Sequence, residues 1–414
     1  ILRARKTDEK LVEGVVGAAK KDDKAEAIDA ERLALRDRLT AALADIRKVK
    51  SAGGGQYLYE FPWYIIIGPP GAGKTTALLN SGLRFPLAER HGAQALKGVG
   101  GTRNCDWWFT EQAVIIDTAG RYTTQDSDAA VDKAGWRNFL SMLKETRPSQ
   151  PLNGTFVVFG IPDIVALGPD ERRAHAHAVR SRLLELQESF GLSPPVYVVF
   201  TKLDMIAGFS EFFDDLDRED REQVLGVTFP LDQRGTTPQA GFGAAFDRLL
   251  ARLRTRLLDR LQTERDLARR NLIFGFPAQF ASLRSVVGDL LTEAFDESRF
   301  AAPLTVRGVY FTSATQQGAP IDRLMGIVAS KFDMAPQALP QQVGSGRGFF
   351  LQRLFDGVVF GEAGLVGANA GVERRRRLVR RPLRSLPRSA RGLHRAGSAQ
   401  LRRQLFRASR RECR

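Results

Sequence analysis

One short stretch restricts the fold of this chain more than any other feature. The apolar run Trp63 to Ile67 leads directly into Gly68-Pro69-Pro70-Gly71-Ala72-Gly73-Lys74-Thr75-Thr76, and the helix-favouring residues Ala77 to Asn80 follow. Glycines at these positions let successive backbone N–H groups point at phosphate oxygens beside a helix N-terminus. A strand, a glycine loop and a helix in this order predict an α/β fold with a P-loop.

The loop also assigns a role to each of its residues. Lys74 is expected to reach the β and γ phosphates of a nucleotide, and the hydroxyl of Thr75 is expected to ligate Mg²⁺. Backbone contacts to the phosphates are expected from Gly68, Gly71, Ala72, Gly73 and Thr76. A chance match to this motif becomes improbable once the flanking strand and helix are required.

A second motif suggests a phosphate-side acid. The run Val114 to Ile116 ends in Asp117-Thr118-Ala119-Gly120-Arg121. Asp117 at a strand end is expected to hold Mg²⁺ through water, while the Gly120 amide senses the γ phosphate. The alternative is a simple turn, since Asp and Gly are common turn residues.

The stretch between these two motifs is rich in glycine. It reads Lys97-Gly98-Val99-Gly100-Gly101-Thr102-Arg103, and Thr102 is a candidate second Mg²⁺ ligand. A surface turn explains this stretch equally well.

A third motif follows another apolar run and suggests a base site. Val196 to Phe200 ends in Thr201-Lys202-Leu203-Asp204. Asp204 can accept hydrogen bonds from guanine N1 and N2, and the stem of Lys202 can pack beside the base. The alternative is a solvated Lys-Asp pair. After the last apolar run, Ser313 and Ala314 are expected to touch the base, and the nucleotide is ATP or GTP.

The alternation of apolar runs and helical stretches predicts a mostly parallel sheet with flanking helices. The expected strands are Trp63–Ile67, Ala113–Ile116, Thr155–Phe159, Val196–Phe200 and Val306–Phe311. Apolar residues from Phe246 to Leu261 at helical spacing, then a second helical stretch from Pro277 to Phe295, predict a helical subdomain. Further helices are expected at Ile321–Phe332 and Phe349–Phe360.

These patterns predict six segments. They are a charged helical linker (1–55), a P-loop NTPase core (56–240), a helical insertion (241–300), the end of the core (301–335), a helical extension (336–370) and an Arg-rich tail (371–414).

The formal net charge of +15 is concentrated in that tail. Residues 371–414 contain 16 Arg against Glu373 and Glu412, so the rest of the chain is nearly neutral. The tail is therefore expected to be disordered, and specific nucleic-acid binding is not expected.

The motif order is that of a GTPase-type site. GKTT, DTAGR and TKLD are similar in form to the signal-recognition-particle group of GTPases. Ras-like enzymes carry a water-positioning Gln where this chain has Arg121. The resemblance implies that Arg121 is a candidate catalytic residue with Lys74, Asp117 and Thr102, and that hydrolysis is slow or partner-dependent.

Longer stretches resemble one family more specifically. They are FPWYIIIGPPGAGKTTALLNSGLRFPLAE, GVGGTRNCDWWFTEQAVIIDTAGRYTTQDS, FGLSPPVYVVFTKLDMIAGFSEFF, IFGFPAQF and RGVYFTSATQQGAPIDRLM. Over residues 30–377 the chain resembles the cytoplasmic domain of IcmF/TssM-type inner-membrane subunits of bacterial type VI secretion systems. The resemblance implies a nucleotide-dependent switch or docking platform at the cytoplasmic face of the inner membrane, with other membrane-complex subunits and the baseplate as partners.

The same resemblance implies membrane helices before and after this domain. Neither is expected in this chain, whose Arg-rich end would fit a frameshift or early stop in the source gene. Two other functions stay open: a non-hydrolysing structural scaffold, and a targeting GTPase similar to the signal-recognition-particle group.

Overall fold

The computed structural model describes residues 26–44 without 27 and 42, and residues 57–86, 105–125, 129–230, 238–295, 304–315 and 347–366. Within this part of the chain, seven strands form one sheet in the order β2-β3-β1-β4-β5-β7-β6. Strands β3, β1, β4, β5 and β7 are parallel, and the edge strands β2 and β6 are antiparallel to their neighbours. The predicted α/β fold with a mostly parallel sheet is confirmed. The strands are β1 Trp63–Ile67, β2 Asp106–Phe109, β3 Val114–Asp117, β4 Gly154–Gly160, β5 Val196–Thr201, β6 Gly226–Thr228 and β7 Val306–Phe311.

Strand β1 lies where the order of the sheet reverses. Its neighbours are β3 on one side and β4 on the other, so the chain extends the sheet first in one direction and then in the other. Open α/β sheets bind ligands at the carboxyl ends of the strands at such a point. The loop that follows β1 therefore occupies the position where a ligand site is expected.

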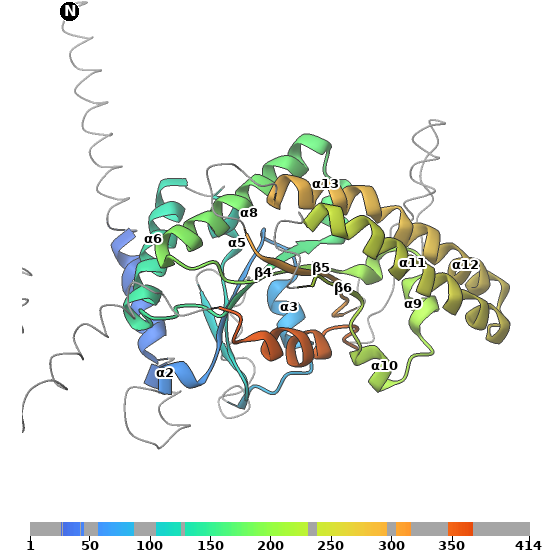
Figure 1. The fold of residues 1–414 in the computed structure, drawn as a ribbon, viewed down its shortest axis with the longest axis horizontal. Helices are drawn as coiled ribbons and strands as arrows, with labels where there is room; N and C mark the ends of the chain where they lie inside the picture. The colour runs from blue at the N-terminus through green and yellow to red at the C-terminus, as the bar shows by residue number, and fades with distance from the viewer. Residues whose placement is uncertain are drawn as a thin grey trace, which may run out of the picture. The chain divides into compact units, whose positions relative to one another are not determined.

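Helices cover both faces of the sheet (Figure 1). One face carries α6 Ala129–Thr146, α8 Pro169–Phe190, α11 Pro238–Thr263, α12 Leu267–Ala281 and α13 Leu283–Phe295. The other carries α3 Lys74–Leu79, the π-helix η2 Leu354–Val359 and the 3-10 helix η3 Phe360–Glu362. The described short elements are α2 Tyr57–Glu60, α5 Gly120–Thr124, α7 Ile161–Ala166, η1 Leu203–Met205, α9 Phe209–Phe213 and α10 Arg218–Glu222.

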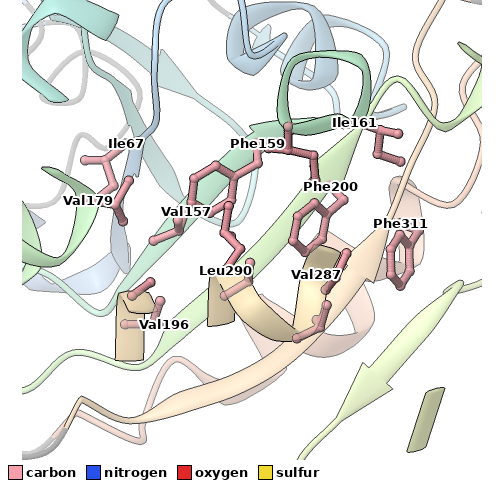
Figure 2. Close-up of a cluster of buried hydrophobic side chains, with 14 of the residues drawn as sticks. Ile67, Val157, Phe159, Ile161, Val179, Val196, Phe200, Val287, Leu290 and Phe311 are labelled. Atoms are coloured by element: carbon pink, nitrogen blue, oxygen red, sulfur yellow. The ribbon is translucent and has the colours of Figure 1, made fainter. Parts of the chain in front are cut away.

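The core is divided into two layers by the sheet. Successive strand residues point to opposite faces, so Trp63, Ile65 and Ile67 join the larger cluster while Tyr64 and Ile66 join the smaller one. Figure 2 shows the larger layer, where Val287 and Leu290 of α13 meet the strands. The rings of Phe159, Phe200 and Phe311 stack across β4, β5 and β7, with centroids 5.8 and 5.5 Å apart. This stacking holds the carboxyl ends of three strands together.

Strands β2 and β6 are not predicted by the sequence patterns. Both are short and lie at an edge of the sheet, β2 with four residues and β6 with three. Because each of these edge strands pairs with a neighbour on one side only, it does not need the continuous apolar run that a central strand buried on both faces requires.

Two helical predictions differ from the structure. The expected helical stretch Pro277–Phe295 contains the end of α12 and the whole of α13, which are separated at Ser282. Helix α12 begins earlier, at Leu267, where the Asp266 side chain accepts a hydrogen bond from the Arg269 amide at 2.9 Å. The expected helix at 349–360 is present, but it is the π-helix η2 followed by the 3-10 helix η3, and the Tyr64 hydroxyl fixes η2 to the sheet by donating to the Val359 carbonyl at 2.9 Å. The expected helix at 321–332 and the tail 371–414 lie outside the described residues.

Candidate nucleotide-binding site

The glycine loop connects β1 to α3 and takes a conformation that its sequence allows. Gly71 and Gly73 have φ angles of +76° and +80°, in the left-handed region that favours glycine. A side chain on Gly68 would lie 2.3 Å from the Val158 carbonyl oxygen of β4. The loop is thus compact and lies against the neighbouring strand.

Lys74 folds back over this loop. Its Nζ donates to the carbonyl oxygens of Gly68 at 2.8 Å and Pro69 at 3.0 Å. Burial lowers the pKa of Lys74 to about 8, although the charge of Asp117 opposes this shift. An ammonium has three donors, and these two bonds aim the Lys74 charge at the inside of the loop.

Thr75 and Asp117 come together from different motifs. Asp117 is the last residue of β3 and lies opposite Ile66 of β1, and its carboxylate accepts a hydrogen bond from the Thr75 hydroxyl. A hydroxyl next to a carboxylate suits Mg²⁺, which takes one or two protein oxygens and completes its shell with phosphate and water. Among the described residues, no group of three or more His, Cys, Asp or Glu side chains could hold a metal ion. These two side chains fit the ion that the sequence motifs imply.

Helix α5 begins at Gly120 and packs on the loop. A Cβ on Gly120 would lie 2.4 Å from the Pro70 nitrogen, so only glycine allows this approach. Three residues later, the Thr123 hydroxyl accepts a hydrogen bond from the Gly68 amide at 3.1 Å. A displacement of the loop would therefore also displace α5.

The third motif reaches the same edge of the sheet. The Thr201 hydroxyl donates to the Ala72 carbonyl of the loop at 2.5 Å. Lys202 has a φ of +60°, and its Nζ lies 3.5 Å from the Asp163 carboxylate at the start of α7. Its stem passes beside Gly73. The expected base-side motif thus contacts the phosphate loop directly.

Asp204 is buried beside Ser313. The Ser313 hydroxyl donates to Asp204 Oδ1 at 2.6 Å, which connects the residues that follow β5 and β7. Burial raises the pKa of Asp204, and the hydrogen bond from Ser313 counteracts this rise. The carboxylate is consequently held in one orientation.

A family comparison covers much of this architecture. The model described as "IcmF-related N-terminal domain" matches residues 129–386, which is more than half of the chain. The chain belongs to the IcmF-related family. The matched range includes the Thr201–Asp204 motif and Ser313 but begins after the phosphate loop.

A curated relative extends the similarity of this IcmF-related chain. "Type VI secretion system component TssM1" of Pseudomonas aeruginosa is 52% identical over 359 residues, which is 86% of this chain and 33% of the relative. A match of that length cannot lie entirely on one side of residues 68–75, so it includes the loop. The chain spans about a third of the relative's length.

A solved structure is also similar in part. It is titled "Signal recognition particle receptor SRb-GTP/SRX complex from Chaetomium thermophilum", with 21% identity, 36% of this chain and 75% of that chain covered, and a TM-score of 0.23. This TM-score is too low to indicate a shared fold. No helix in the described part of this IcmF-related chain is long and apolar enough to cross a membrane.

The structure gathers most of the predicted site residues at one edge of the sheet. They are Gly68, Gly71, Ala72, Gly73, Lys74, Thr75, Thr76, Asp117, Gly120, Thr201, Lys202, Asp204, Ser313 and Ala314. Thr102 lies outside the described residues. Arg121 is engaged elsewhere: its guanidinium pairs with Glu31 and with Asp132.

Sequence reasoning missed several residues at this edge of the sheet. Thr118 donates to the Ile66 carbonyl at 2.7 Å, and Thr123 and Asp163 make the contacts described above. Glu31 and Asp132, the partners of Arg121, were missed as well. Only Thr118 and Thr123 could have been found from the local sequence, because Thr118 lies within the second motif and Thr123 follows it by two positions. The others come from distant segments, and their roles depend on the fold.

Proposed function

We propose that this chain is the nucleoside-triphosphate-binding and hydrolysing domain of a type VI secretion component, and that the nucleotide controls its shape or its docking. The convergence of Lys74, the Thr75–Asp117 pair and the Thr201–Asp204 motif at one edge of the sheet carries this proposal. These groups come from the ends of β1, β3 and β5, and a purely structural loop would not require all three.

Each residue has a separate task in this proposal. Lys74 neutralises charge on the β and γ phosphates, and the Gly120 amide responds to the γ phosphate. Thr75 and Asp117 hold Mg²⁺, which when bound shields the charge that develops on the phosphate oxygens. Thr201 and Lys202 support the base-side wall, and Asp204 faces the base.

The similarity to TssM1 supports a place in a secretion complex. We infer that the chain acts at the cytoplasmic face of the bacterial inner membrane, where the other subunits of the membrane complex and the baseplate are its partners.

A second candidate is a non-hydrolysing scaffold that binds nucleotide or nothing. The position of Arg121 favours it, because the guanidinium of this residue, which follows Gly120, pairs with Glu31 and Asp132. The first candidate is therefore expected to hydrolyse nucleotide slowly or only with a partner, and the scaffold is expected not to hydrolyse it.

The test is the substitution Lys74→Ala in the full chain. Loss of the buried cation is expected to weaken binding of ATP or GTP with Mg²⁺ by about 100-fold or more, measured by calorimetry. Lys133→Ala, which removes an exposed lysine on α6, is the matched control. Unchanged affinity in Lys74→Ala would disprove the nucleotide site, and binding without turnover of either nucleotide would favour the scaffold.

A further inference from the structure

Arg121 lies at the centre of a buried polar cluster. Its Nη1 is 2.5 Å from Asp132 Oδ1, its Nη2 pairs with Glu31, and its guanidinium carbon lies 4.6 Å above the Tyr122 ring. The Tyr122 hydroxyl also donates to Glu31. We call these four residues the Arg121 cluster.

Glu31 reaches this cluster from a distant part of the sequence. It belongs to the helical segment 28–41, which is fixed to the larger core by the buried side chains of Leu35 and Leu39. A Cβ on Gly135 of α6 would lie 2.7 Å from Glu31 Oε2, so the absence of a side chain there makes room for the carboxylate. Both carboxylates are buried, with side-chain exposures of 7% for Glu31 and 1% for Asp132.

Helix α5 joins the Arg121 cluster to the phosphate loop. Its first residue, Gly120, packs on Pro70, and its fourth, Thr123, accepts a hydrogen bond from the Gly68 amide. Arg121 lies between these two contacts. The guanidinium that two carboxylates neutralise therefore belongs to the residue directly after Gly120.

We propose that Arg121 is a regulated cation of the nucleotide site, which Glu31 and Asp132 hold away from the phosphates until the helical segment 28–41 moves. This regulation rests on the proposed function. Glu31 and Asp132 are positioning residues, because they act on the ligand only through Arg121. Movement of the segment removes Glu31 from the guanidinium and leaves Asp132 as the remaining carboxylate of the Arg121 cluster. The weaker restraint lets the guanidinium turn toward the γ phosphate, where it stabilises the charge of the transition state.

Electrostatics set the direction of the effect. An arginine that reaches the transferring phosphoryl group raises kcat by about 10³- to 10⁵-fold in related chemistry. Two buried carboxylates beside Arg121 cancel its positive potential toward the loop. Weakening one of these contacts should therefore raise turnover more than it changes ground-state binding.

The experiment measures kcat and KM of the full chain with Mg²⁺ and whichever of ATP and GTP binds more tightly. Glu31→Gln is expected to raise kcat about ten-fold or more, with KM changed by less than about three-fold. Asp37→Asn is the matched control, since it removes the same charge from an exposed position of the same segment. Its kcat should equal that of the parent chain.

Two further variants separate the mechanism from a loss of stability. Gly135→Ala places a methyl group against the Glu31 carboxylate and should raise kcat without altering any charge. Glu31→Gln combined with Arg121→Gln should lose the gain, because the cation that Glu31 restrains is gone. Thermal unfolding verifies that each variant is folded.

The outcomes distinguish the two proposals. If the parent chain binds nucleotide but Glu31→Gln and Gly135→Ala gain no turnover, or Asp37→Asn gains as much, the regulation of Arg121 is overturned and the nucleotide site stands. If the parent chain binds neither nucleotide, the proposed function fails and the regulation fails with it.

Discussion

Lys74 is a charged side chain in a place that solvent hardly reaches, with 7% of its surface exposed. Its pKa of about 8 means that the free protein loses this charge slightly above neutral pH. Bound phosphates would favour the charged form and raise the pKa again. Binding above that pH must therefore take up a proton.

The pH dependence of binding follows from this shift. Nucleotide affinity is expected to be nearly constant below pH 8 and to fall by up to about ten-fold per pH unit above it, until the pKa of the complex is reached. Calorimetry from pH 7 to about 9.5, in buffers of different ionisation enthalpy, measures both the affinity and the proton uptake. Lys74→Arg should show no such slope, since arginine stays charged. A flat profile in the parent chain would contradict the assignment.

Asp204 should decide the choice of base. With one oxygen bound to Ser313, its carboxylate can accept from guanine N1 and N2, so GTP should bind more tightly than ATP by about 1–3 kcal/mol. Asp204→Asn should shift the preference toward xanthosine triphosphate, whose C2 carbonyl accepts where guanine donates. Competition binding with the three nucleotides measures this shift. Asp170→Asn, which removes the same charge from an exposed position on α8, is the control, and equal affinities for ATP and GTP would show that Asp204 does not read the base.

At the scale of elements, one buried ion pair fixes the short helix η3 to the sheet. Arg307 of β7 donates from Nε to Glu362 of η3 at 2.9 Å and pairs with it a second time through Nη2. The Tyr197 hydroxyl of β5 donates to the same carboxylate at 2.8 Å. The Arg307 side chain is only 6% exposed. The Glu362 carboxylate of η3 thus connects Arg307 of β7 with Tyr197 of β5.

Removing this carboxylate should be costly. Glu362→Ala leaves a buried, uncompensated Arg307 and is expected to lower the free energy of unfolding by about 3–5 kcal/mol. Arg218→Ala breaks an exposed pair with Glu222, in which Arg218 is 82% exposed, and should cost about 1 kcal/mol or less. Urea denaturation compares the two. Equal small losses would mean that η3 contributes little to the fold.

The whole molecule is expected to keep its stability without the Arg-rich tail. The described residues up to Val366 form one compact unit, and the segment 371–414 has no helical or strand periodicity that would pack on a core. Deleting 371–414 should leave the melting temperature unchanged and weaken salt-sensitive adsorption to anionic lipid or nucleic acid. Calorimetric melting and vesicle sedimentation test this. A much lower melting temperature would show that the tail is structural.

The central sheet and the phosphate loop could be predicted because their causes are local. Strands β1 and β7 begin and end at the predicted residues, since a strand buried on both faces needs a continuous apolar run. Gly71 and Gly73 are where the loop needs left-handed backbone. These features depend on residues that are neighbours in the sequence, so the sequence pattern alone predicts them.

Other features required the tertiary structure because their causes are distant. The edge strands β2 and β6 form because they pair antiparallel with β3 and β7, and no local sequence pattern predicts this pairing. Arg121 could be identified from its place after Gly120, but its partners Glu31 and Asp132 lie 90 and 11 positions away. Hydrophobic periodicity determined which segments fold, whereas the direction of each polar side chain was decided by the groups that folding placed around it.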